Sequence, residues 1–381
     1  MRSWEIWRRP ELNTHVAERV RNLPLTPGVY LMKDSRGTII YVGKAKQLKR
    51  RVQSYFHHAK SHSPKIAKLV AHIAELEYRN TDTEFEAFML ECRLIQELKP
   101  MYNRKMKNPL AYTYVAVRNK AGLRRMEVTE TSEGDGESMY FGPYTASKHS
   151  VQRAIESIEE CYHLACRQPL TGRACLNYSL GLCLGVCLGG EAVQEYERIM
   201  DRIVSLLQGS GSALFDEMEQ SMQMAAESFE FEAAARWRDH IESVKFLLSK
   251  RKVIEFSAQN LSTVVYEYID DAAIKLFLIR QHELLFSQKY ALPADGHQRG
   301  LLAAEIRSRI LQYFRIDSDP GKAMAQISRE EIDQAQIIYN YLHGSGSCHL
   351  HIQQSWLKEM EQQELDEALD SFLPPISREN I

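Results

Sequence analysis

The residue with the most chemical meaning in this chain is a carboxylate in an apolar setting, Glu91. At about 100° per residue of helix, Glu91 falls on the same stripe as Ala87 and Leu94. An unpaired buried charge costs several kcal/mol, so a cation must lie beside Glu91. Two alternatives meet that need. One is a metal ion bound by Glu91, and the other is a structural ion pair with Arg51 or Lys44, which the helix pattern alone favours.

A predicted hairpin and a predicted helix precede this carboxylate. Residues 29–32 and 38–42 are rich in β-forming side chains and flank a glycine-containing turn, which predicts a β-hairpin. Beyond the hairpin the apolar spacing becomes helical. Lys44, Arg51 and Tyr55 stand at steps of seven and four, so we expect these three side chains to share one helical face.

The helix that carries Glu91 has boundary signals of its own. Thr81 and Glu84 fit a capping box, which predicts the start of the helix, and Pro100 stops it after about Leu98. Glu84 points to the same side as Glu91, but the capping box already gives Glu84 a structural role.

Composition and charge restrict the class of protein. The chain has 381 residues, more than twice a usual domain of about 150 residues, so we expect two to four units. A hydrophobic content of 44% and a charged content of 26% are those of an ordinary folded protein. The net charge of −2 conceals a split: residues 1–110 carry 21 Lys and Arg against 11 Asp and Glu, hence +10, which leaves −12 for the remainder. The basic first part indicates a polyanionic partner.

The chain shows no membrane or export signal, so we expect a cytoplasmic protein with no membrane partner. No stretch approaches the ~18 apolar residues of a membrane helix, and the first residues lack the apolar run of a signal peptide.

Clustered cysteines in a reducing compartment indicate a bound metal rather than disulfides. Spacing alone allows zinc or an iron–sulfur cluster, and packing by small buried cysteines is the metal-free alternative. Five cysteines fall within 27 residues, namely Cys161, Cys166, Cys175, Cys183 and Cys187.

Seven positions stand in the order found in one nuclease family. They are Tyr30 in Gly28-Val29-Tyr30, Tyr41 and Lys44 in Tyr41-Val42-Gly43-Lys44, then Arg51, Tyr55, Glu91 and Asn103. The chain therefore resembles the GIY-YIG endonucleases. The resemblance implies a small antiparallel sheet flanked by helices and a nuclease that uses one divalent cation, Mg²⁺ or Mn²⁺.

The resemblance also implies a role for each matched residue. A single carboxylate with several waters suits Mg²⁺, so Glu91 would be the metal ligand. Tyr30 would position or deprotonate the attacking water, and a nearby cation should lower its pKa from about 10 for that purpose. Arg51 would hold the phosphate through its planar fork. Tyr41 and Lys44 would orient the substrate or the water, and Tyr55 and Asn103 would support the site. Further phosphate contacts would come from Lys46, Lys49 and Arg50.

Further segments resemble the N-terminal half of UvrC, the incision subunit of bacterial nucleotide excision repair, over roughly residues 20–290. They are Gly43-Lys44-Ala45-Lys46, Ser54-Tyr55-Phe56, Lys99-Pro100-x-Tyr102-Asn103, Tyr140-Phe141-Gly142-Pro143-Tyr144, the cysteine segment and a UVR-type helical pair. The resemblance implies that Cys166, Cys175, Cys183 and Cys187 hold a four-iron, four-sulfur cluster, with Cys161 outside the set. It implies that the helical pair docks on UvrB, with Phe229, Phe231 and Glu232 at its turn as contact residues.

The chain also departs from the family. It ends without the ribonuclease-H-like nuclease and helix-hairpin-helix modules of UvrC, and residues 108–112 replace a basic run usual in the family. It is thus similar to short UvrC homologues of the Cho type, which make only the 3′-side incision. We therefore expect damaged double-stranded DNA as substrate and UvrB, in its complex with UvrA-loaded DNA, as partner. The alternatives are a non-catalytic UvrB-binding adaptor and a redox regulator built on the cysteine segment.

These observations predict an α+β, multidomain protein with a small antiparallel sheet flanked by helices. The predicted parts are an N-terminal segment (1–24), the GIY-YIG nuclease domain (25–110), a connecting β/α segment (111–160), a cysteine-rich iron–sulfur-type segment (161–190), a UVR-like helical hairpin (191–255) and a small C-terminal α/β region that lacks the second nuclease (256–381).

Overall fold

The computed structural model divides the chain into two compact units. The first joins residues 1–108 with 256–381, and the second comprises residues 109–255. The mixed α and β content agrees with the predicted fold class. The structure describes residues 14–57, 63–104, 106, 113–132, 138–144, 146–164, 166, 172–315, 329–344, 348–358 and 362–375. The replaced basic run at 108–112 and most of the loop predicted at 132–136 lie outside these residues.

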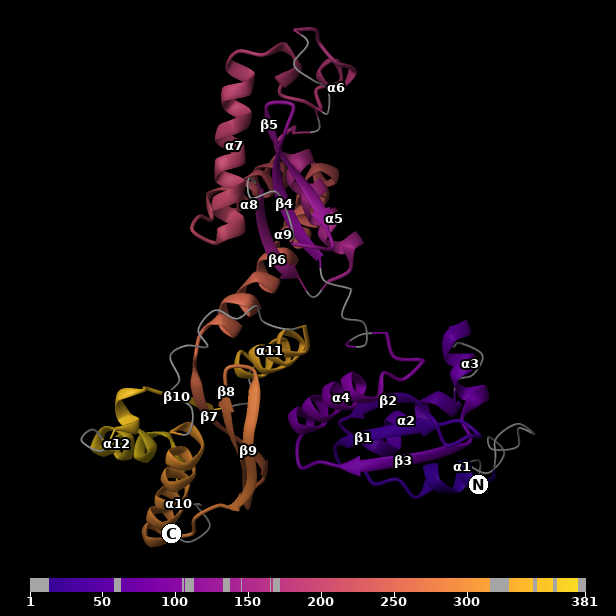
Figure 1. Ribbon diagram of the computed structural model, residues 1–381, viewed down its shortest axis with the longest axis vertical. Helices are drawn as coiled ribbons and strands as arrows, with labels where there is room; N and C mark the ends of the chain where they lie inside the picture. The colour runs from indigo at the N-terminus through magenta and orange to yellow at the C-terminus, as the bar shows by residue number, and fades with distance from the viewer. Residues whose placement is uncertain are drawn as a thin grey trace. The chain divides into compact units, whose positions relative to one another are not determined.

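The N-terminal part of the first unit is a three-stranded antiparallel sheet in the order β2-β1-β3 with helices around it (Figure 1). The predicted hairpin is confirmed: β1 and β2 pair with Tyr30 opposite Gly43, and the turn is held where the Asp34 carboxylate accepts the Thr38 N–H at 2.9 Å. The elements are α1 (Thr14–Arg21), β1 (Gly28–Lys33), β2 (Ile39–Ala45), α2 (Leu48–His57), α3 (Pro64–His72), β3 (Glu75–Asn80) and α4 (Glu84–Leu98).

Both faces of this sheet are buried, which explains the continuous apolar run of β1. Val29 and Leu31 pack with Ala87 and Leu94 of α4 on one face. The alternate side chains of β1, Tyr30 among them, pack with α1 and α2 on the other face, as the period of two in a strand requires. Since β2 is an edge strand, the two faces meet along it.

Two local predictions were wrong. Lys44 is the penultimate residue of β2 and not part of the helix with Arg51 and Tyr55, so the three side chains do not share one helical face. The N-cap of α4 is Thr83, whose side chain accepts the Glu86 N–H, and not Thr81. Thr83 and Glu86 fit the same capping-box pattern two residues later in the chain. Glu84 therefore has no capping role. The predicted end of this helix is confirmed, because α4 stops at Leu98.

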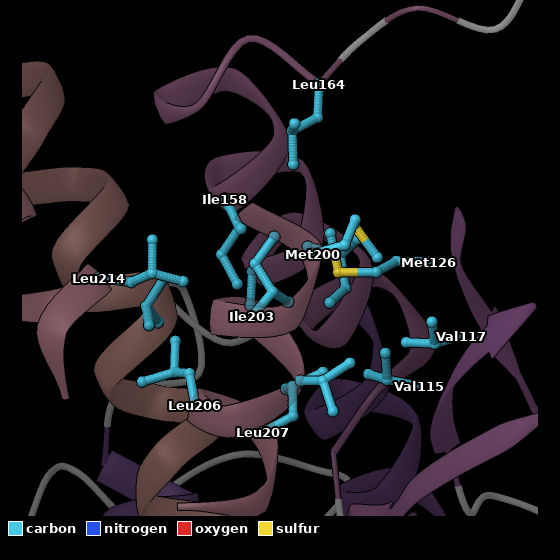
Figure 2. Packing of buried hydrophobic residues seen from close by; sticks show 14 of the residues in the cluster. Val115, Val117, Met126, Ile158, Leu164, Met200, Ile203, Leu206, Leu207 and Leu214 are labelled. Atoms are coloured by element: carbon cyan, nitrogen blue, oxygen red, sulfur yellow. The ribbon is translucent and has the colours of Figure 1, made fainter. Parts of the chain in front are cut away.

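The second unit has a three-stranded antiparallel sheet in the order β5-β4-β6. Its core joins this sheet to helices, with Val115 and Met126 of the sheet against Ile158, Met200 and neighbours on α5 and α7 (Figure 2). The elements are β4 (Thr113–Lys120), β5 (Leu123–Thr129), β6 (Met139–Tyr144), α5 (Lys148–Cys161), α6 (Leu176–Ser179), α7 (Glu191–Gln208), α8 (Ala213–Glu227) and α9 (Phe231–Ala258). The stretch predicted to be helical, residues 191–255, consists of α7, α8 and most of α9 with short turns between them.

The C-terminal part of the first unit is a four-stranded antiparallel sheet in the order β10-β7-β8-β9 with helices. Its core includes Val264, Leu276 and Ile306. Both strands and helices are present, in agreement with the small α/β region predicted for residues 256–381. The elements are β7 (Ser262–Asp270), β8 (Ala273–Arg280), β9 (Glu283–Ala291), α10 (Gly296–Phe314), α11 (Arg329–Leu342), β10 (Cys348–Ile352) and α12 (Gln362–Phe372). Among all the described helices, none has the length and apolar character needed to span a membrane.

Candidate active site

A pocket of about 660 Å³ opens at the edge strand of the N-terminal sheet. Its walls come from both sides of that sheet: Tyr30 belongs to the face covered by α2, and Glu91 belongs to α4 on the other face. Both side chains reach the same pocket because β2 is the edge strand, where the two faces of the sheet meet. The lining residues are Tyr30, Tyr41, Lys44, Ala45, Lys46, Gln47, Arg50, Arg51, Glu84 and Glu91.

The structure brings together most of the residues singled out in the sequence. Three of them lie elsewhere. Tyr55 is buried beneath the pocket, Asn103 is buried beside β2, and Lys49 is not among the lining residues. The sequence analysis missed Gln47 and set Glu84 aside as a capping residue. Because Glu84 lies on the same helical side as Glu91, the helical wheel alone was a sufficient signal for it.

Three tyrosine hydroxyls cluster at the pocket: Tyr30 and Tyr41 line it, and Tyr55 lies buried next to them. The Tyr30 and Tyr55 hydroxyls lie 2.9 Å apart, and the Tyr55 and Tyr41 hydroxyls lie 3.4 Å apart. Arg51 donates from Nη2 to the Tyr55 hydroxyl at 3.5 Å. Arg51 and Tyr55 are one helical turn apart on α2, so their side chains lie on the same face. The cluster therefore presents a guanidinium and phenol oxygens to one space.

Burial raises the pKa of two of these tyrosines, Tyr30 and Tyr41. It raises the pKa of Tyr30 well above 10, the neighbouring Tyr55 and Tyr41 raise it further, and only the Arg51 guanidinium lowers it. Burial likewise raises the pKa of Tyr41. We expect a cation to lower the pKa of Tyr30. Among the described side chains the Arg51 guanidinium has that effect, and burial outweighs it.

Glu91 is held by the main chain of the edge strand. Its Oε1 accepts the Lys44 N–H at 3.0 Å, one of the outward N–H groups that an edge strand leaves unpaired. The Lys44 ammonium pairs with Glu84 at 3.1 Å. Among the described residues, neither Lys44 nor Arg51, the two expected partners, forms a direct ion pair with Glu91, although the charge of each lowers the Glu91 pKa. Burial raises the pKa of the Glu91 carboxyl, and the hydrogen bond from Lys44 opposes that shift.

Asn103 holds the same strand two residues earlier, at Val42. Its Oδ1 accepts the Val42 N–H at 3.0 Å, and its Nδ2 donates to the Val42 carbonyl at 2.9 Å. The segment after α4 thus completes the edge of β2 and sets the strand that carries Tyr41 and Lys44. Asn103 acts as a positioning residue, since it touches the backbone and not the pocket.

Gly43 admits the Tyr30 ring. A Cβ at this position would lie 2.3 Å from the Tyr30 hydroxyl oxygen and 2.4 Å from its Cζ, far inside van der Waals contact. Any other residue at position 43 would therefore displace the Tyr30 hydroxyl. This close approach explains why glycine follows the second tyrosine motif.

The donor set at Glu91 fits a hard divalent cation. Carboxylate oxygen is a ligand that Mg²⁺ accepts, and Mg²⁺ keeps several waters when one carboxylate binds it. Among the described residues, the second oxygen of Glu91 has no hydrogen-bond partner, and the carboxylate borders a pocket with room for waters. When bound, such a cation would stabilise negative charge on a phosphate.

The four cysteines assigned to the cluster converge in the second unit. The ligand atoms of Cys166, Cys175 and Cys187 all lie within 4.8 Å of one another, and Cys183 packs in the same group. Cys183 accepts the Gly185 N–H at Sγ, at 3.3 Å, and a main-chain N–H lowers the pKa of the Cys175 thiol. Convergent sulfurs, one of them the Cys175 thiol with a lowered pKa, fit a thiolate-bound metal.

The turn between α8 and α9 carries the predicted contact residues. Phe229 is 78% exposed and Phe231 is 67% exposed, and their rings meet edge to face at 6.1 Å between centroids. Glu232 beside them is also exposed. Trp237 packs against the core of the second unit, so the apolar stripe divides into a core end and an exposed end.

Comparison with known proteins agrees with this architecture. Residues 26–104 match a family described as the UvrC-like GIY-YIG domain, residues 112–206 match the UvrC/Cho excinuclease middle domain, and residues 213–245 match the UvrB/UvrC motif. The N-terminal fold and site thus define a domain of the GIY-YIG endonuclease class. The chain belongs to the UvrC family over the region of these matches, residues 26–245.

Individual relatives that the chain matches are named UvrABC system protein C. UvrABC system protein C of Acetivibrio thermocellus is 36% identical over 338 residues, which covers 86% of this chain and 53% of that protein. The Caldicellulosiruptor saccharolyticus protein is 37% identical over 309 residues, with 79% and 50% covered. The chain therefore spans about half the length of these relatives. The magnesium-bound GIY-YIG N-terminal endonuclease domain of UvrC from Thermotoga maritima is 34% identical, with 24% of this chain and 100% of that one covered and a TM-score of 0.23.

Proposed function

We propose that this protein is a metal-dependent endonuclease of nucleotide excision repair, which nicks damaged duplex DNA on the 3′ side of the lesion. The observation that carries the proposal is the single pocket that gathers Tyr30, Arg51 and Glu91. Phosphodiester hydrolysis needs an activated water, a held phosphate and stabilised charge. These three side chains offer a phenol oxygen, a guanidinium and a metal-binding carboxylate for those tasks.

The basic residues around the pocket support DNA as the substrate. Lys46 and Arg50 line it and are exposed, which suits contacts to phosphates on either side of the scissile bond. Arg51 is placed for a bidentate phosphate contact. The Lys44 ammonium would attract DNA phosphates less strongly than an unpaired lysine, because Glu84 already pairs with it.

UvrB is the proposed recruiting partner. The exposed Phe229 and Phe231 at the turn of the UVR-type hairpin offer two aromatic anchors to a partner surface, and Glu232 offers a charged contact beside them. The same exposed turn favours a second candidate function, a non-catalytic adaptor that occupies UvrB.

An incision assay separates the two functions. Incubation with a lesion-bearing duplex, UvrA, UvrB and Mg²⁺ should produce a nick 3′ to the lesion, and omission of UvrB should reduce it strongly. An adaptor would bind UvrB and leave every duplex intact. Nicking that does not depend on UvrB would contradict the recruitment step alone.

We also propose that Cys166, Cys175, Cys183 and Cys187 hold a four-iron, four-sulfur cluster. Anaerobically purified protein should absorb near ~400 nm and contain iron, as thiolate-bound clusters do. Cys175→Ser should remove most of the absorbance, because it deletes one of the converging sulfurs, whereas Cys161→Ser should leave it unchanged. Zinc in place of iron would show that the site holds a different metal.

A further inference from the structure

The helix that carries Glu91 is buried on two sides, and its second side has no role in the proposed chemistry. Glu84 and Glu91 of α4 face the pocket. Phe85, Met89 and Cys92 lie on the opposite side and are also buried. Within the first unit, the C-terminal part covers that side, and α11 packs against α4.

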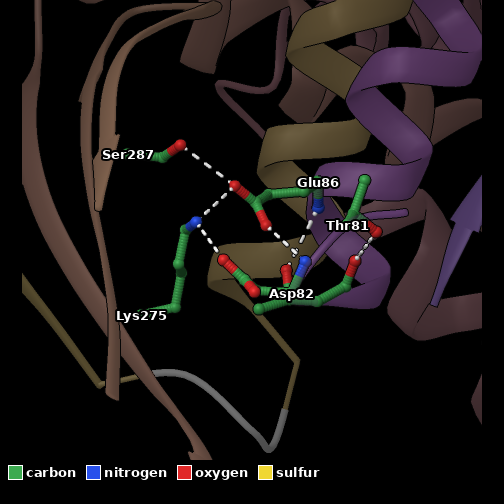
Figure 3. Close-up of polar contacts among 6 residues, drawn as sticks. Thr81, Asp82, Glu86, Lys275 and Ser287 are labelled. Atoms are coloured by element: carbon green, nitrogen blue, oxygen red, sulfur yellow. Dashed lines mark hydrogen bonds and ion pairs between the residues drawn. The ribbon is translucent and has the colours of Figure 1, made fainter. Parts of the chain in front are cut away.

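A buried lysine of the C-terminal sheet binds the first turn of α4. The side chain of Lys275, on β8, is only 8% exposed, and its Nζ lies 2.6 Å from a carboxylate oxygen of Asp82 and 2.9 Å from one of Glu86 (Figure 3). Ser287 of the neighbouring strand donates to Glu86 at 3.0 Å. Glu86 also accepts the Asp82 N–H at 3.0 Å. The Glu86 side chain is 14% exposed and that of Asp82 is 43% exposed, so loss of Lys275 would leave the Glu86 carboxylate unpaired in a largely buried site, which is costly.

An aromatic contact holds the same turn. The Phe85 ring stacks on Tyr341 of α11 at 3.9 Å between centroids and 8° between planes, and it meets Phe277 of β8 edge to face at 5.1 Å. The Tyr341 hydroxyl in turn donates to Glu267 at 2.7 Å. The first turn of α4 is therefore fixed by packing as well as by charge.

This fixed turn is linked to the metal-binding carboxylate. Glu84 lies between Asp82 and Glu86 in sequence and pairs with the Lys44 ammonium at 3.1 Å. The main-chain N–H of Lys44 is donated to Glu91 at 3.0 Å. A shift of the first turn would therefore move Glu84, Lys44 and the partner of Glu91 together.

We propose that Lys275 is a positioning residue for the divalent cation: through Asp82 and Glu86 it holds α4 so that Glu91 and the Lys44 main chain keep a metal-binding geometry. The proposal rests on the proposed function, because it takes Glu91 as the ligand. It gives the C-terminal part, which has no catalytic role in the proposed function, a task at the active site.

The test measures Mn²⁺ affinity of the full chain by electron paramagnetic resonance of the free ion, without DNA. Lys275→Met should weaken the Glu91-dependent Mn²⁺ site about tenfold, the lower end of the effect of outer-shell partners on metal affinity. Lys275→Arg, which keeps the charge, should recover most of the affinity. Lys289→Met is the matched control, because Lys289 is the cross-strand partner of Lys275 and is exposed; it should bind Mn²⁺ as the wild type does. Glu91→Gln defines the background.

A second variant keeps the proposal testable if Lys275→Met does not fold. Glu86→Gln retains the shape of the side chain and should weaken Mn²⁺ binding about threefold, and the double variant should bind no more weakly than Lys275→Met, since both act through one contact. Folded variants with affinity within twofold of the wild type, or with additive losses, would overturn the proposal.

Mn²⁺ affinity measured without DNA tests the role of Lys275 separately from nuclease activity. A wild type that binds Mn²⁺ through Glu91 but nicks no DNA would overturn the proposed function and leave the Lys275 comparison to decide the inference. A wild type without a Glu91-dependent Mn²⁺ site would overturn both.

Discussion

Replacement of Glu91 by glutamine should reduce nicking by about 10³-fold or more, because the pocket loses the oxygen donor suited to a divalent cation, whose charge stabilisation is worth several kcal/mol. The amide keeps the size of the side chain and can still accept the Lys44 N–H through its oxygen, so the fold should persist. Single-turnover incision of a lesion-bearing duplex with UvrA, UvrB and Mg²⁺ measures the loss.

Glu84 provides the matched control for this prediction. It lines the same pocket from the same helix, but its carboxylate is paired with the Lys44 ammonium. Glu84→Gln should therefore lower the rate by less than about tenfold, because it removes one exposed ion pair and leaves the Lys44 side chain more mobile. Equal losses for both variants would show that Glu91 has no special role, and an active Glu91→Gln protein would remove it from the mechanism.

Replacement of Tyr30 by phenylalanine should lower the rate by about 10² to 10⁴-fold and also change the pH profile, since a positioned general base contributes that much. Burial holds the pKa of Tyr30 above 10. Below that pKa the deprotonated fraction rises tenfold with each pH unit. The logarithm of the wild-type rate, measured at saturating Mg²⁺, should therefore rise with pH with a slope of about one between about pH 6 and 9, and Tyr30→Phe should lose this slope.

Tyr78 is the control for the tyrosine substitution. It is the cross-strand partner of Tyr30 on β3 and is 37% exposed. Tyr78→Phe should keep both the rate and the slope. The Tyr30 variant should remain folded, because its lost hydrogen bond to Tyr55 is worth only about 1 kcal/mol. A Tyr30→Phe protein with an unchanged pH slope would assign the base to another group.

Local patterns predicted the elements around the site well. The hairpin was predictable because its two runs are adjacent in the chain and joined by a short turn, and the end of α4 was predictable because Pro100 follows it. The errors were also local. The seven-residue step from Lys44 to Arg51 suggests a helix, although Lys44 belongs to a strand. The Thr81 capping-box match has a second match two residues later, and the structure uses the second, at Thr83.

The pairing of Glu91 could not be predicted from its helix. The wheel showed that a carboxylate needed a partner, but its partner is a main-chain N–H of an edge strand, and no pattern of side chains encodes an unpaired backbone group. The raised pKa of Tyr30 was missed for a similar reason, since it depends on how closely Tyr41 and Tyr55 pack around the hydroxyl.

The sequence by itself determined which residue types serve the site, because the tyrosines, Arg51 and Glu91 stand at spacings set by short, adjacent elements. The tertiary structure alone decided how these residues are held. Lys275 reaches Asp82 from 193 positions away in the chain, and Phe85 stacks on Tyr341 of α11. Contacts at such separation depend on the packing of whole domains, for which local periodicity carries no signal, so only the folded protein shows that the helix bearing Glu91 is held from both sides.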